Sequence, residues 1–143
     1  MAATASEKAI KQAIEARNAA LTAKDVPGVM ASGAAGFVSY NLAPPLKAGG
    51  GKAGLAAAWF ATWDGPIRHE MRDLKIVAGD EVGFAHGLIH MSGRKLDGEV
   101  VDLWFRQTFG LKRSSRGWKI VHEHGSVPYY MDGSFRAAID LKP

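Results

Sequence analysis

The stretch that decides the fold is residues 99–128, EVVDLWFRQTFGLKRSSRGWKIVHEHGSVP. It holds two runs rich in aromatic and β-branched residues, 99–111 and 117–127, joined by a polar turn at 112–117. Such runs around a short turn predict an antiparallel β-hairpin. Upstream, residues 67–77 and 81–92 predict two further strands of the same kind. After the hairpin, we expect residues 131–143 to add a short final element.

The N-terminal half has a different pattern, with apolar residues at helical spacing. The segments that predict helices are 6–24, 29–35 and 52–63. Ser6 is the expected N-cap of the first helix. Residues 37–42 alternate and predict a strand. The Pro- and Gly-rich residues 43–51 predict a loop, which we expect to cover the entrance of a pocket.

Helices followed by a run of antiparallel strands are typical of an α+β domain. We therefore expect one domain over residues 1–143, a cone-shaped, curved antiparallel sheet with three N-terminal helices packed on its concave face. A chain of 143 residues that is 47% hydrophobic is large enough to bury such a core without staples.

Composition excludes several classes of function. The chain has no cysteine, which removes disulfides, thiolate metal sites and cysteine nucleophiles. The net charge is +4, but basic residues alternate with acids, so we expect no nucleic-acid partner. Neither a signal peptide nor a run of eighteen apolar residues occurs, so we expect a cytoplasmic protein without a membrane partner.

Two motifs of the deciding stretch carry a family resemblance: DLWFRQT at 102–108 and GWKIVHEHGSVP at 117–128. They resemble the SnoaL-like, ketosteroid-isomerase-like group of the nuclear-transport-factor-2-like superfamily. The second motif is also similar to the association domain of calmodulin-dependent kinases, and DLKP at 140–143 matches many bacterial members. The resemblance implies the cone fold. It does not choose a function, because this fold hosts isomerases, cyclases, dehydratases, hydrolases, transport factors and assembly domains.

The resemblance allows one comparison by residue. The catalytic aspartate of the steroid isomerases falls at about Tyr40, and their two oxyanion donors fall at about Arg17 and Phe109. The base and both donors are therefore replaced. We expect that the protein is not a steroid isomerase.

Strand alternation assigns the side chains to two faces. We assign one face to the concave side because it is mostly apolar: Leu103, Phe105, Gln107 and Phe109, with Val121, Glu123 and Gly125 of the last strand. Trp118 and Ile120 then fall on the outer face. That outer face is too aromatic for bare solvent, and the resemblance implies a homodimer through it. The expected interface residues are His86, His90, Asp102, Trp104, Arg106, His122, His124 and Ser126.

The expected function is binding of a small apolar or weakly acidic molecule inside the cone, with proton transfer as the expected chemistry and no cofactor. Desolvation inside the cone favours acid–base work by Glu123, while Gln107 orients the ligand and Tyr40 donates a hydroxyl. The expected ligand-binding residues are Arg17, Tyr40, Trp59, Trp63, Ile89, Met91, Phe105 and Phe109.

Alternative interpretations remain open for the same residues. Glu123 and Arg17 also suit a purely structural ion pair. His122 and His124 share a face and suit a zinc site, but the resemblance implies no metal and an interface hydrogen-bond network explains the same residues, so we expect no metal. A Ser126–His124 hydrolase is disfavoured, because same-face neighbours on a strand lie about 6.5–7 Å apart. The alternative for the whole chain is a non-catalytic oligomerisation or assembly domain.

Overall fold

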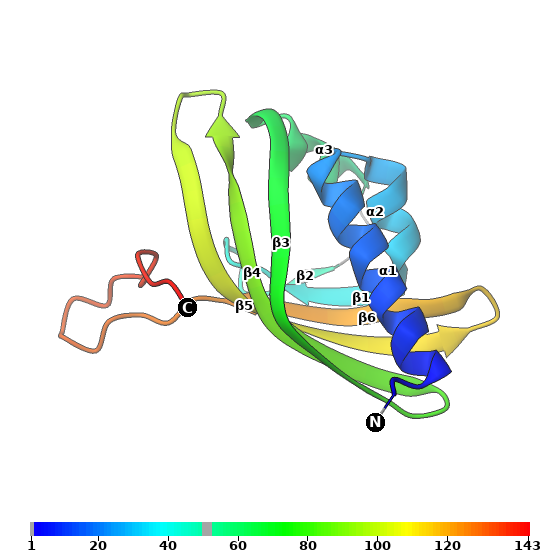
Figure 1. Ribbon diagram of the computed structural model, residues 1–143. Coiled ribbons are helices and arrows are strands. Elements are labelled where there is room, and N and C mark those ends of the chain that lie inside the picture. Colours follow the sequence, from blue (N-terminus) through cyan, green and yellow to red (C-terminus); the bar gives the residue numbers. More distant parts are fainter. Residues whose placement is uncertain (1, 50–52) are drawn as a thin grey trace.

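The computed structural model describes residues 2–49 and 53–143, and it confirms the α+β fold class (Figure 1). The elements in chain order are α1 (Ala5–Thr22), α2 (Val26–Ser32), β1 (Gly33–Tyr40), β2 (Ala48–Gly49), α3 (Ala53–Phe60), β3 (Trp63–Ala78), β4 (Val82–Lys95), β5 (Val100–Ser114) and β6 (Gly117–Ser126). The helices lie on the concave side of a strongly curved sheet (Figure 1). Of the loop expected to cover the pocket, Gly50 and Gly51 lie outside the described residues.

The sheet has the strand order β2-β1-β6-β5-β4-β3. Strands β3 to β6 form the antiparallel meander that the sequence predicts. The sheet as a whole is mixed, because β1 pairs with β6 in parallel. A parallel pair is possible because α3 and four strands separate β1 from β6 in the chain, so no hairpin joins them. The pairing brings Ser39 of β1 beside Glu123 of β6.

Helix α1 begins at a capping box. The Thr4 hydroxyl accepts from the Glu7 backbone N–H at 3.1 Å, and the Glu7 carboxylate accepts from the Thr4 backbone N–H at 2.9 Å. Thr4, and not the expected Ser6, is therefore the N-cap, because its position allows this reciprocal pair with Glu7. The inner face of α1 buries Ile10 and Ile14 in the main core, against Ala85, Phe109, Leu111, Trp118 and Ile120 of the sheet.

A β-bulge at Val121 sets the inner face of β6. Gly110 pairs with His122 while Leu111 pairs with Ile120, so Val121 has no opposite residue. The extra residue shifts the alternation by one position. Trp118 and Ile120 are consequently buried on the concave side, and their expected place on the outer face is wrong. Glu123, beyond the bulge, lies on the concave side and is buried, as expected.

A second irregularity lies in the edge strand β3, where the register shifts between Arg72 and Lys75 and Asp73 has φ of 57°. A β-branched residue is strained in this left-handed conformation. We expect Asp73→Val to lower the free energy of unfolding by about 1–2 kcal/mol. Arg68→Val, at an exposed position of the same strand, should cost far less. Urea denaturation of both variants measures the difference, and equal costs would contradict the strain argument.

The segment after β6 forms neither a helix nor a strand. Its limbs meet at an isolated bridge between Tyr129 and Ala137, so the final element expected from the sequence is only a short, irregular hairpin. In Figure 1 it projects from the side of the sheet that faces away from the helices. No helix among the described residues is both long and apolar enough to cross a membrane.

Candidate functional site

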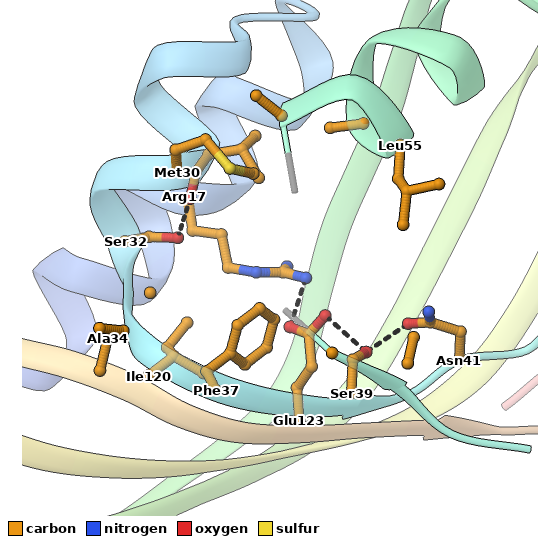
Figure 2. A pocket seen from close by; sticks show the side chains of 17 residues that line it. Arg17, Met30, Ser32, Ala34, Phe37, Ser39, Asn41, Leu55, Ile120 and Glu123 are labelled. Carbon is orange, nitrogen blue, oxygen red and sulfur yellow. Dashed lines mark hydrogen bonds and ion pairs between the residues drawn. The ribbon is translucent and has the colours of Figure 1, made fainter. Parts of the chain in front are cut away.

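A cavity of about 390 Å³ opens between the helices and the end of the sheet where β1 and β6 pair. Most of its wall is apolar, formed by Val29, Met30, Phe37, Leu55, Ala56 and Ile120 among others. Four polar side chains gather at its floor: Arg17, Ser39, Asn41 and Glu123 (Figure 2). The cavity is thus an apolar container with one polar end, which is typical of a small-molecule site.

The floor is organised around an ion pair between Arg17 of α1 and Glu123 of β6. Arg17 Nη2 donates to Glu123 Oε2 at 2.6 Å, and each side chain is only 11% exposed. Arg17 Nη1 also donates to Asn18 Oδ1 at 3.3 Å, and the guanidinium carbon lies 5.3 Å from the centre of the Phe109 ring. These contacts fix the guanidinium between the helix and the sheet, facing the cavity.

Ser39 and Asn41 complete the floor, and the sequence interpretation missed both. Ser39 Oγ lies 3.3 Å from Glu123 Oε1 and also within hydrogen-bond distance of Asn41 Oδ1. A hydroxyl has one proton and cannot donate to both oxygens. Turning the Asn41 amide lets its N–H donate to Ser39, which leaves the Ser39 proton for Glu123. Strand alternation alone would have placed Phe37, Ser39 and Asn41 on one face, opposite Tyr40.

Tyr40 does not line this cavity, and its expected place there is wrong. Its ring lies on the outer face, edge-on to His122 and His124 at centroid distances of 4.8 and 5.4 Å. The reason is parity, because Tyr40 neighbours the inward-facing Ser39 on an extended strand. Gln107 is buried beneath Gly125 of β6 and is not part of the cavity lining.

The other residues expected to bind ligand belong to the core. Trp59 and Trp63 pack in a second core cluster with Phe60, Ile67 and Leu21, and Met91 contacts the same cluster. Ile89, Phe105 and Phe109 are buried in the sheet and do not line the cavity. Of the expected ligand-binding set, the structure places Arg17 alone in the cavity wall, together with Glu123 from the expected catalytic set.

His69 of β3 is a half-buried titratable group that the sequence interpretation did not select. It faces α1, with its ring centre 6.5 Å from that of Trp59, and it lines a second cavity of about 810 Å³ between α1 and β3. Its Nδ1 has no hydrogen-bond partner among the described residues. Burial lowers the pKa of His69 to about 4; the Arg17 charge acts in the same direction and the Ile67 backbone opposes it.

The outer face carries the side chains expected there. His90 stacks on Trp104 at 4.6 Å between ring centres, and its Nε2 lies 2.5 Å from Asp102 Oδ1. This hydrogen bond lowers the pKa of the Asp102 carboxyl. The residues His86, Arg106, His122, His124 and Ser126 are exposed or half-buried. The described part of the chain contains no group of three or more acidic, His or Cys side chains placed to hold a metal ion.

Comparisons with known proteins agree with this architecture. Residues 10–130 match a family model described as a SnoaL-like domain. The chain is similar to an NTF2-like protein of unknown function from Pseudomonas putida KT2440, with a TM-score of 0.87, 29% identity and 99% of each chain covered. No curated protein sequence matches the chain.

Two more distant structures show the fold alone. A ketosteroid isomerase-like protein from Erwinia carotovora atroseptica has a TM-score of 0.74 and 20% identity, over 87% of this chain and 97% of that one. An NTF2-like superfamily protein from Salmonella enterica has a TM-score of 0.76 and 14% identity, over 90% of this chain and 94% of that one.

Proposed function

Because the chain belongs to the SnoaL-like family of the NTF2-like superfamily, we propose that it binds a small, largely apolar molecule in the Arg17–Glu123 cavity. The apolar wall holds the body of the molecule. The single polar group of the molecule contacts the ion pair at the floor of the cavity. The observation that carries the proposal is a buried, hydrogen-bonded ion pair at the floor of an open apolar cavity.

The energetics of buried ion pairs favour a functional role. Taking two charges out of water costs about as much as their attraction returns, and apolar replacements are often as stable or more stable. An ion pair whose two side chains are each only 11% exposed is therefore not explained by stability alone. Facing a cavity, the same pair offers a ligand both donors and an acceptor in fixed positions.

The chemistry that suits this floor is cofactor-independent proton transfer, as in an isomerase, cyclase or dehydratase. Glu123 accepts a proton from the bound molecule and returns it, and the Arg17 N–H groups stabilise the negative charge that develops. A steroid isomerase is not proposed, because Tyr40, at the position of that enzyme's base, points away from the cavity.

Ligand binding tests this function. The probes are 2-cyclohexenone and cyclohexanol, which are small and apolar with one polar group, each followed by NMR chemical-shift changes at the Arg17 side chain. We expect Glu123→Gln to weaken binding by about tenfold or more, because it replaces the charged acceptor. Glu15→Gln is the matched control, because it makes the same chemical change in an exposed ion pair. Glu15 lies on α1, as Arg17 does, and pairs with Lys11 at 3.8 Å, with both side chains 60% exposed. Equal binding by all three proteins, or by none, would contradict the proposal.

The outer face favours a second, structural function. We propose that two copies pair through the face that holds His90, Asp102 and Trp104, forming a homodimer. A non-catalytic assembly domain is the competing function for the whole chain, and the same aromatic face supports it. Mass measurement in solution separates the two: a dimer agrees with a ligand-binding homodimer, and a larger ring agrees with an assembly domain.

A further inference from the structure

We propose that residues 127–143 form an arm that clasps a second copy of this chain. The inference rests on the proposed pairing of outer faces and adds a second contact surface to it. Most of the arm, residues 131–143, lies beyond the family-model match, which ends at residue 130. The likeness to the Pseudomonas putida protein covers 99% of both chains and so includes it.

The arm is an ordered hairpin with its own hydrogen bonds. The backbone N–H of Ala138 donates to Pro128 and that of Tyr130 donates to Arg136, both at 2.8 Å. Asp132 caps the turn by accepting from the Ser134 N–H at 2.9 Å, and the Tyr130 hydroxyl donates to Asp140. Such a network fixes the shape of the arm before any partner arrives, which lowers the entropic cost of docking.

Most of the large apolar side chains on this ordered arm face solvent. Their exposed fractions are 50% for Tyr129, 84% for Met131, 76% for Phe135, 60% for Ile139 and 46% for Leu141. Scattered exposed apolar residues are ordinary, but several on one projecting hairpin mark an interaction site. The arm's side-chain charges balance, with Asp132 and Asp140 against Arg136 and Lys142, so an anionic surface is not the favoured partner.

The position of the arm selects a second copy as the partner. The arm begins directly after Ser126, which pairs with Arg106 at the edge of the outer face. Near its end, Lys142 lies close enough to Asp102 to stabilise that carboxylate. The arm therefore continues from the edge of the outer face and projects beside it (Figure 1). In a twofold-symmetric dimer the two outer faces pack against each other, and each arm lies along the edge of the partner's outer face.

The test measures the dimer dissociation constant of the full chain by analytical ultracentrifugation. The arm variant is Met131→Gln with Phe135→Asn; asparagine tolerates the φ of 56° at position 135, so the hairpin should keep its shape. The matched control is Leu96→Gln, which removes a side chain that is 68% exposed in the turn between β4 and β5. We expect the arm variant to weaken the dimer by about tenfold or more and the control to leave it unchanged.

The remaining outcomes separate this inference from the pairing on which it rests. A wild-type dimer that the arm variant leaves unchanged would overturn the clasp and keep the outer-face pairing, which a Trp104→Ser variant then tests. A wild-type monomer would overturn both. Far-ultraviolet circular dichroism and the melting temperature of each variant test whether it is folded. Loss of the dimer counts against an intact interface only in a variant that is folded.

Discussion

Arg17→Met should lower the free energy of unfolding by about 3–5 kcal/mol, the largest effect we expect from one substitution at the candidate site. Methionine fills much of the space of the arginine but leaves the Glu123 carboxylate buried without its 2.6 Å partner. The Ser39 hydroxyl, 3.3 Å from the other carboxylate oxygen, is too weak a donor to replace it. Urea denaturation at neutral pH measures the loss.

The double variant Arg17→Met with Glu123→Gln shows whether the ion pair serves stability or ligand binding. It removes both charges at nearly constant volume, so we expect it to recover most of the stability that the single variant loses. Ligand binding should remain absent, because the charged donor and acceptor are gone. A double variant as unstable as the single one would mean that the pair is structural, and the proposed function would lose its main support.

The sequence predicts the meander of β3 to β6 well, because alternation and short turns are local signals. It fails at two places where distant segments decide the outcome. The parallel contact of β1 with β6 joins residues far apart in sequence, and no local pattern reports it. The bulge at Val121 moves Trp118 and Ile120 to the inner face. One extra residue in a strand does not change the local sequence pattern, so the bulge cannot be predicted from it.

The candidate site shows the same division between local and distant signals. Glu123 is predicted to lie in the cone, because a polar residue on an otherwise apolar strand face is visible in the alternation. Arg17 is predicted there from its place on the first helix, from which its side chain can reach the cavity. Ser39 also follows strand alternation, but the resemblance assigns the site position to its neighbour Tyr40, which alternation places on the opposite face. His69 was missed because its burial depends on how α1 covers β3, which only the assembled fold shows.

The pH dependence of stability should carry the signature of His69. Its pKa is about 4 in the folded protein, against 6.5 for the ordinary side chain. Between these values the unfolded chain binds the proton and the folded protein does not, so stability is complete above about pH 6.5 and falls as the pH approaches 4. We expect the wild type to lose up to about 3 kcal/mol more than His69→Gln over this range.

Comparing the two proteins separates His69 from the carboxylates, which titrate in both. Parallel stability curves would show that His69 does not carry the effect. A direct measurement is the NMR titration of the His69 ring. The same titration in Arg17→Met should move the midpoint upward, because the Arg17 charge is the second cause of the lowered pKa. That shift would show that the Arg17 charge acts on the pKa of His69. A ligand that displaces Arg17 from Glu123 should then also change the pKa of His69.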